Sequence, residues 1–237
     1  MPLEERETPL AGGRSTPGVV RAGDTVRRPL KPDSDRVHAL LLHFERSGFD
    51  GAPRFLGIDE QGRAIYSFIE GFAPPHNGFR LDDDAVRAGA RLVRRVHDLT
   101  EGTEFAAGSE VACHPNLSQP NFVFRGRKDM SPVAIIDWDG THPGTRLSNF
   151  ADFLWAFVHP SVYAEGEPAA RMLQIAAEAY GWSGDGLVEA MLEVVERFQT
   201  VVEGDPGAMA WGAAELAYMR RNAGVFRKAL AATTLRR

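Results

Sequence analysis

Only one cysteine, Cys113, occurs among the 237 residues, so the chain can form no intramolecular disulfide and no cysteine-based metal site. No apolar run approaches the roughly 20 residues that a membrane-spanning helix needs. The first ten residues, MPLEERETPL, have neither the basic nor the apolar segment of a secretory signal. The sequence therefore predicts a cytoplasmic protein without a membrane partner.

Basic clusters are scarce as well. Lys and Arg number 27 against 32 Asp and Glu, which gives a formal net charge of -5. The basic residues are scattered, apart from a short group at Arg21, Arg27 and Arg28. Nucleic-acid binding needs Lys and Arg gathered on one face. We therefore expect no nucleic-acid partner.

The first third of the chain has the pattern of strands, turns and one helix. GVVRAGDTVRRPL places apolar and β-branched residues on either side of Gly23-Asp24, which is a hairpin signal. PDSDRVHALLLHFERSGF has apolar residues at helical spacing and stops at Gly48. The strand AIYSFIEG follows and ends at Gly71. The Pro- and Gly-rich stretch FAPPHNGF after it is typical of a linker.

The rest of the chain is mainly helical. Three consecutive aspartates from Asp82 favour a helix start, and an amphipathic helix follows them. NFVF and PVAIIDW predict two short strands, so the loop CHPNLSQP and the segment DWD should lie at the outer ends of one hairpin. From residue 148 on, four segments with apolar faces predict helices. We expect one lobe over residues 1–71 and a second over 72–237.

The hairpin places two oxygen ligands at neighbouring strand ends. Asn121 follows the loop, and Asp137 ends the returning strand. An amide oxygen and a carboxylate are hard ligands of the kind that Mg²⁺ prefers. Taken alone, each residue is more often a turn or strand-end residue. The joint pattern favours a metal site.

Three motifs resemble a known family. HPNLSQPNFVF, VAIIDWDG and PGTRLSNFADFLWAF are similar to the H-x-D-x-x-x-x-N, I-D-W/F-D/E and G-P-x-x-x-D-L-A series of the aminoglycoside phosphotransferase and choline kinase superfamily. The resemblance covers roughly residues 10 to 160. It implies an α+β, two-lobed protein-kinase-like fold. In that fold a small, mixed, β-rich N-terminal lobe binds nucleotide and a larger C-terminal lobe is helical.

The resemblance also implies roles for matching residues in the second lobe. Asp137 would bind Mg²⁺, Asn121 would be the second metal ligand, and His114 would organise the catalytic loop. The expected cofactors are therefore ATP or GTP together with Mg²⁺.

In the first lobe the matches are looser. The phosphate-binding lysine of the family falls nearest to Arg28, whose planar guanidinium is no simple replacement for an ammonium group. Gly12 and Gly13 would cover the phosphates, although they do not form a G-x-G-x-x-G motif. The adenine-facing hinge would consist of Ser67, Phe68, Ile69 and Glu70.

Departures from the family pattern concern charged positions. Asn116 stands where the family has its catalytic aspartate, and an amide can orient a hydroxyl without taking its proton. Asn149 stands where an aspartate braces the loop, and Val37-His38 occupy the place expected for a glutamate. Asp139 and Asp152 are neighbours that could supply a base, although each is more often structural.

The sequence thus favours a small-molecule phosphotransferase with weakened or altered catalysis, with Asn116, His114 and Asp139 at its centre. Residues 161–215 contain ten carboxylates and only two arginines. This excess of negative charge suits an amine-bearing acceptor or makes a solvated acidic surface. The alternative from another class is a pseudokinase-like binding or regulatory module, or a repurposed pocket without phosphoryl transfer.

Overall fold

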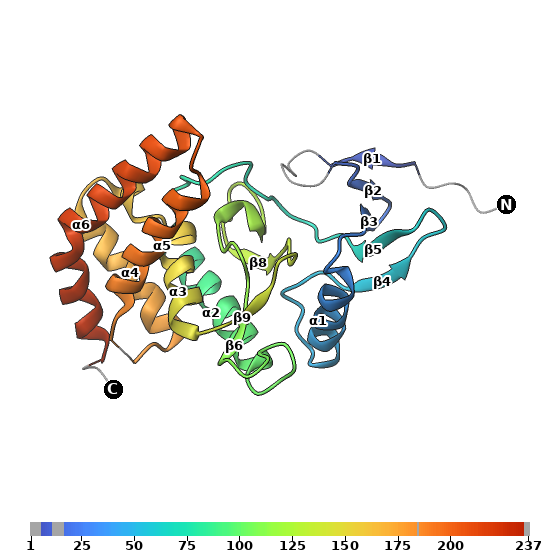
Figure 1. Cartoon of the computed structure of the whole chain (residues 1–237), viewed down its shortest axis with the longest axis horizontal. Coiled ribbons are helices and arrows are strands. Elements are labelled where there is room, and N and C mark those ends of the chain that lie inside the picture. The colour runs from blue at the N-terminus through green and yellow to red at the C-terminus, as the bar shows by residue number, and fades with distance from the viewer. Residues whose placement is uncertain (1–5, 11–16, 184, 235–237) are drawn as a thin grey trace.

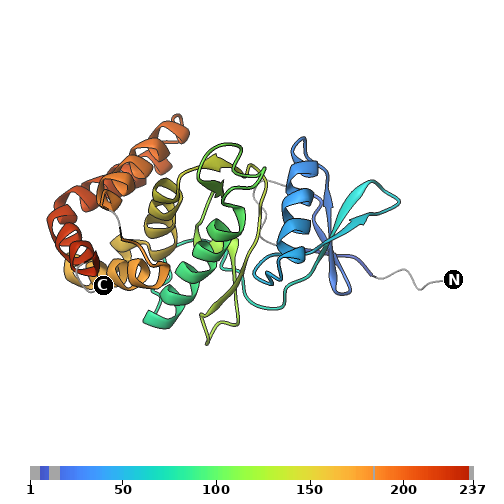
Figure 2. The same ribbon diagram turned by 90° about the horizontal axis from the view of Figure 1, so that it is seen from below.

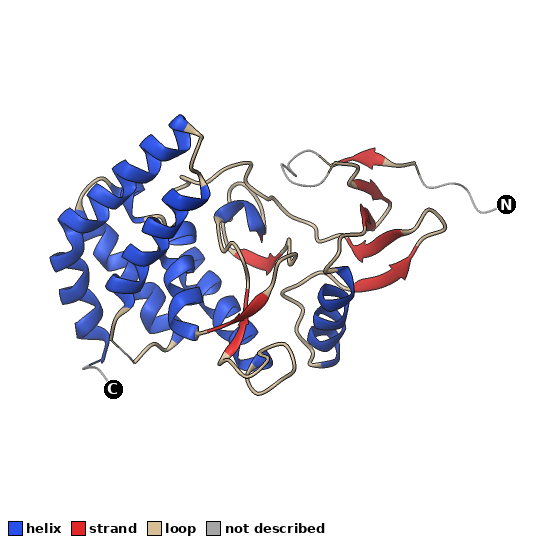
Figure 3. Cartoon of the chain, in the orientation of Figure 1, coloured by secondary structure: helices blue, strands red, loops and turns tan. Residues whose placement is uncertain are grey.

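The computed structural model describes residues 6–10, 17–183 and 185–234. A sheet-rich part and a helical part follow one another along the long axis (Figure 1). Strands gather in the first part and at the centre of the molecule, and helices fill the far side (Figure 3). The predicted two-lobed α+β architecture is confirmed.

The first part is built on a five-stranded antiparallel sheet with the order β1-β2-β3-β5-β4. Its strands are β1 (Thr8–Pro9), β2 (Val20–Ala22), β3 (Thr25–Pro29), β4 (Phe55–Ile58) and β5 (Arg63–Ser67). The predicted hairpin turns at Gly23, whose φ of 57° suits a residue without a side chain. The predicted strand that was to end at Gly71 ends earlier, at Ser67.

Helix α1 (Ser34–Arg46) links this sheet to the rest of the molecule. Figure 2 shows it between the sheet and the helical part. Its apolar face includes Phe44, whose ring lies 5.0 Å from that of Trp138 and 5.3 Å from that of Phe49, centroid to centroid. One continuous apolar core therefore runs from α1 into the second part.

The linker joins the first part to a strand of the second. Phe72 exchanges two backbone hydrogen bonds of 2.7 and 2.8 Å with Phe124. Helix α2 (Asp83–Thr100) then starts where predicted, because the side chain of Asp82 accepts a hydrogen bond from the backbone N–H of Ala85 at 2.8 Å.

Two small two-stranded sheets and one helix surround the loop that carries the motif. Strand β7 (Phe122–Phe124) pairs with β8 (Pro132–Ile135), and β6 (Val111–Cys113) pairs with β9 (His142–Gly144). The short 3-10 helix η1 (Gln119–Asn121) leads into β7. Helix α3 (Arg146–Phe153) follows β9 and continues into the π-helical segment η2 (Leu154–Val158). The predicted β7–β8 hairpin is confirmed.

The remaining helices form the far side of the molecule. They are the 3-10 helix η3 (Pro160–Tyr163) and helices α4 (Gly166–Tyr180), α5 (Leu187–Val201) and α6 (Pro206–Thr234). Within the part of the chain that the structure describes, none of the helices is both long enough and apolar enough to cross a membrane.

Candidate functional site

The outer ends of the β7–β8 hairpin meet as the sequence predicts. The backbone N–H of Ile136 donates to the carbonyl of Asn121 at 2.8 Å, so Asn121 lies beside the residue that precedes Asp137. Asp137 has a φ of 65°, a left-handed conformation that few residues with a side chain adopt. Its side chain remains 38% exposed. The fold thus holds a carboxylate at a strained, accessible strand end.

Two cations from the first part pair with Asp137 and with its neighbour Asp139. Nη2 of Arg28, on β3, lies 2.8 Å from Oδ1 of Asp137 and 2.5 Å from Oδ2 of Asp139. Nζ of Lys31 lies 2.8 Å from the same Asp139 oxygen. The sequence analysis assigned Arg28 to the site but missed Lys31. Its position two residues after β3 was the available signal.

His114 is fully enclosed beneath the loop as a neutral ring. Burial lowers its pKa to about 4. Nε2 of His114 is 3.0 Å from the carbonyl oxygen of Ile136, so this nitrogen carries the proton. Nδ1 accepts a hydrogen bond from the backbone N–H of Asn116 at 3.2 Å. His114 therefore ties the loop to the end of β8, which fits the organising role that the resemblance implies.

Asn116 is exposed at the turn of the loop. Its side-chain oxygen accepts a hydrogen bond from the backbone N–H of Ser118 at 3.2 Å. The backbone carbonyl oxygen of Asn116 accepts a hydrogen bond from Nδ2 of Asn121 at 2.9 Å. The amide of Asn121 is thus turned with its nitrogen on the loop, which leaves its oxygen as the end that could act as a metal ligand.

Asn149 braces the loop from α3. Its Oδ1 accepts from the backbone N–H of His114 at 3.2 Å and from Nε2 of His97 at 3.0 Å. Its Nδ2 donates to the carbonyl of His114 at 2.8 Å. An amide at this position therefore supports the loop through three hydrogen bonds. No local pattern pointed to His97, which lies 52 residues from Asn149 in the chain.

Asp152 is a second brace, one helical turn beyond Asn149. Its Oδ2 accepts a hydrogen bond from the backbone N–H of Leu117 at 2.9 Å. Burial raises the pKa of this carboxyl to about 6, against the smaller lowering effects of the Leu117 hydrogen bond and of Arg197 and His142. Of the two carboxylates considered as substitute bases, Asp152 touches the loop and Asp139 is held by cations.

The hinge predicted at residues 67–70 leaves β5 and crosses to the linker. The backbone N–H of Ser67 donates to Arg54 and that of Phe68 donates to Asp24, at 2.9 and 2.8 Å. The side chain of Glu70 pairs with Arg21. The N–H groups of Ser67 and Phe68 are thus engaged within the first part. Those of Ile69 and Glu70 are therefore the candidates for contact with the base of a nucleotide. Gly12 and Gly13 lie outside the described residues.

The donor set fits a hard divalent cation. Asp137 offers a carboxylate and Asn121 an amide oxygen, the ligand types that Mg²⁺ takes together with water and phosphate oxygens. Among residues 6–10, 17–183 and 185–234, no three His, Cys, Asp or Glu side chains gather into a self-sufficient metal cage. A metal held here would therefore need further oxygen ligands, which nucleotide phosphates can provide.

Solved structures share this architecture. An aminoglycoside phosphotransferase from Streptomyces rimosus, in complex with ADP and streptomycin, superposes with a TM-score of 0.55 at 16% identity over 80% of this chain and 90% of that one. For an ethanolamine kinase from Plasmodium vivax the TM-score is 0.59 at 11% identity, over 89% and 80%. The fold is that of the aminoglycoside phosphotransferases. At such low identity the likeness concerns the fold alone.

The chain is also similar in sequence to an immunity protein. The trifolitoxin immunity protein of Rhizobium leguminosarum bv. trifolii is 34% identical over 161 residues, which cover 61% of this chain and 59% of that protein. The chain therefore spans less than two thirds of the length of this relative. No model of a known protein family matches the chain.

Proposed function

We propose that the protein is a kinase-like small-molecule phosphotransferase that transfers the γ-phosphate of ATP or GTP to a hydroxyl of a small acceptor. One observation carries the proposal. The carboxylates of Asp137 and Asp139 meet the cations of Arg28 and Lys31 at the junction of the two parts, beside Asn121. Phosphoryl transfer needs metal ligands and phosphate-binding cations assembled in this way.

Each residue then has a defined task. Asp137 and Asn121 would hold Mg²⁺, which neutralises charge on the phosphates when it is bound. Arg28 and Lys31 would exchange their carboxylate partners for phosphate oxygens. Residues 1–71 would form the nucleotide lobe, with the hinge at Ser67 to Glu70, and residues 72–237 the acceptor lobe.

Catalysis in this site is expected to be weak. Asn116 can orient the acceptor hydroxyl through its side-chain oxygen, but an amide cannot take up the proton. General-base assistance contributes about 10²- to 10⁴-fold. A loose transition state tolerates late loss of the proton, so transfer slows without stopping.

An amine-bearing acceptor is the substrate class that the charges favour. Glu215 is 5% exposed, and its carboxylate accepts hydrogen bonds from Ser161 at 2.5 Å and from Trp155 at 3.3 Å. Trp155 presents its indole N–H to Glu215, and its ring lies 5.8 Å from that of Trp211, so a carboxylate and two aromatic rings, both of which attract cations, lie close together. Two other acidic residues of this region, Glu189 and Glu196, are paired with arginines and contribute less.

A second candidate is a kinase-shaped binding or regulatory module without phosphoryl transfer. The relative of 34% identity is named an immunity protein, and that name states no transferase activity. The replacement of the catalytic aspartate by Asn116 agrees with this candidate as well.

Titration calorimetry and turnover assays separate the two candidates. We expect Mg-ATP or Mg-GTP to bind, and we expect Asn116→Asp to raise nucleotide turnover by about 10²-fold or more because it restores a base. Asn222→Asp, which adds the same charge on α6, is the matched control and should leave turnover unchanged. Absence of binding at millimolar nucleotide would overturn the phosphotransferase. Binding without turnover in either form would favour the module.

A further inference from the structure

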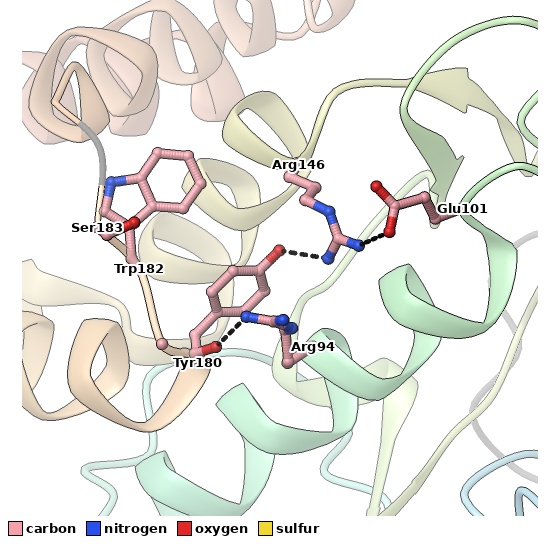
Figure 4. A pocket seen from close by; sticks show the side chains of 7 residues that line it. Arg94, Glu101, Arg146, Tyr180, Trp182 and Ser183 are labelled. Atoms are coloured by element: carbon pink, nitrogen blue, oxygen red, sulfur yellow. Dashed lines mark hydrogen bonds and ion pairs between the residues drawn. The ribbon is translucent and has the colours of Figure 1, made fainter.

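A cavity of about 340 Å³ opens in the helical part of the molecule (Figure 4). Its walls come from the second half of α2, the first residue of α3 and the segment that ends α4. The residues that line it include Arg94, Glu101, Arg146, Tyr180 and Trp182. None of them belongs to the nucleotide site proposed above. The volume lies at the lower end of the range for small-molecule pockets.

Two guanidinium groups are held together at this cavity by one carboxylate. Oδ1 of Asp98 lies 2.8 Å from Nε of Arg94 and 3.0 Å from Nη1 of Arg146. Nη2 of Arg146 then reaches a second carboxylate, that of Glu101, at 3.0 Å. Arg146 is thus fixed from one side by Asp98, while its other N–H group faces the cavity rim.

Glu101 is the weakly held member of this group. Its side chain is 64% exposed, whereas that of Arg146 is 18% exposed. Exposed ion pairs contribute little, typically under about 1 kcal/mol, because water competes for both partners. If Glu101 turns outward, the two arginines and Asp98 leave one net positive charge. The carboxylate of Glu101 therefore marks the place that a carboxylate from outside can occupy.

The wall beside this charge is aromatic. The rings of Tyr180 and Trp182 lie 6.1 Å apart, and the guanidinium carbon of Arg94 lies 5.5 Å from the Tyr180 ring centroid. Figure 4 shows the indole of Trp182 beside the Tyr180 ring. We propose that this pocket binds a small aromatic carboxylate, whose anionic group replaces Glu101 on Arg146 and whose ring packs beside Trp182.

A buried chain of hydrogen bonds leads from this pocket to the loop of Asn116. Nη1 of Arg146 donates to the hydroxyl of Tyr180 at 3.5 Å, and that hydroxyl donates to Nδ1 of His97 at 2.8 Å. His97 is neutral, because burial lowers its pKa to about 4, and its Nε2 donates to Asn149. Asn149 in turn holds both backbone groups of His114. Occupation of the pocket should therefore steady the loop, whether or not the loop transfers phosphate.

Binding is tested with benzoate as the probe, by calorimetry on the full chain. We expect Glu101→Gln to strengthen benzoate binding about two- to fivefold, since the competing carboxylate is gone. Arg146→Gln should weaken it at least tenfold. Glu104→Gln, an exposed carboxylate three residues beyond Glu101 and outside the pocket lining, controls for overall charge and should change nothing.

Several results would overturn the site. One is that benzoate binds neither to the unaltered protein nor to Glu101→Gln. Another is that Glu101→Gln and Glu104→Gln strengthen benzoate binding equally. A third is that acetate or inorganic phosphate, which lack the ring, bind as tightly as benzoate. A melting curve for each variant shows whether it is folded, and Glu101→Gln alters only an exposed side chain.

The link to the loop has its own readout. Benzoate should slow amide hydrogen exchange at His114, whose N–H is bonded to Asn149. Tyr180→Phe keeps the aromatic wall but lacks the hydroxyl, so it should still bind benzoate while losing the effect at His114. An effect that persists in Tyr180→Phe, or none in the unaltered protein, would contradict the coupling.

Discussion

The amides of Asn116 and Asn149 both contact the loop, and their physical consequences differ. Asn149 must satisfy two N–H donors and one carbonyl acceptor. An amide can do both, whereas an ionised carboxylate only accepts. The amide of Asn149 therefore holds the loop in place. Asn116 offers a hydrogen-bond partner at the turn of the loop but cannot take up a proton.

The raised pKa of Asp152 makes the stability of the protein depend on pH. A carboxyl whose pKa rises from 3.8 in the unfolded chain to about 6 in the folded protein stabilises the fold fully below pH about 4. That contribution is lost as the pH rises through about 6, because the folded protein must then hold a desolvated charge. The groups facing Asp152 are the Leu117 N–H, Arg197 on α5 and His142 on β9. The net effect is destabilising at neutral pH.

We therefore expect Asp152→Asn to stabilise the protein at pH 7, by at most about 3 kcal/mol, and to have no such effect near pH 4. The new amide oxygen can still accept from Leu117. Urea unfolding at several pH values measures the difference in unfolding free energy between the variant and the unaltered protein. The contributions of the other titrating groups cancel in this difference. A constant difference between pH 4 and 7 would contradict the assignment.

At the scale of elements, local sequence patterns predicted the helices and hairpins whose residues lie close together in the chain. The helix over Ser34–Arg46 follows from apolar spacing, and the β7–β8 hairpin follows from two apolar runs around a polar turn. Because a hairpin brings its own ends together, the backbone contact of Asn121 with Ile136, the residue before Asp137, could be inferred without coordinates.

Contacts between distant segments could not be inferred in this way. Pairing of β6 with β9 joins strands about 30 residues apart, and Val111–Cys113 has no period of its own. His97 reaches Asn149, and Lys31 reaches Asp139, only because separate elements pack together. The left-handed backbone of Asp137 likewise depends on tertiary structure.

The linker provides a prediction about how the two parts are joined. Gly71 has a φ of 153°, and a Cβ atom there would lie 2.3 Å from the carbonyl oxygen of Phe124, which accepts the Phe72 hydrogen bond. Gly71→Ala should therefore cost at least about 2 kcal/mol of unfolding free energy. Calorimetry or urea unfolding measures this cost.

Gly62 is the matched control for that substitution. It also has a positive φ, of 75°, but nothing lies within 4 Å of a Cβ built there. Gly62→Ala should cost only about 1 kcal/mol of backbone strain. Equal losses for the two variants would show that close packing against Phe124 is unimportant.

At the scale of the whole molecule, a group of four charges joins the two parts. Arg28 and Lys31 belong to the first part, and Asp137 and Asp139 belong to the second. The side chains of Arg28 and Asp139 are only 14% and 15% exposed, so their attraction is less screened than that of a surface pair. The cations proposed to bind phosphate are therefore occupied by carboxylates while no nucleotide is bound.

Because carboxylate and phosphate compete for the same cations, removing a carboxylate should change the stability of the protein and its affinity for nucleotide in opposite directions. Asp139→Asn removes a charge that Arg28 and Lys31 share, so the ligand-free protein should lose about 1–3 kcal/mol of stability. The same change frees Lys31 and leaves Arg28 paired with Asp137 alone, so ADP measured in the presence of a chelator should bind several-fold more tightly. Calorimetric melting and ADP titration on one preparation give both values.

Asp59→Asn separates this effect from general destabilisation. Asp59 pairs with Arg63 at 2.8 Å inside the first part, away from the junction. Its loss should lower the melting temperature without changing the affinity for ADP. If Asp139→Asn weakened ADP binding instead, the carboxylate would have to assist the phosphate site rather than compete with it. The four charges would then act as a preformed part of the nucleotide site, and the ligand-free ion pairs would not oppose binding.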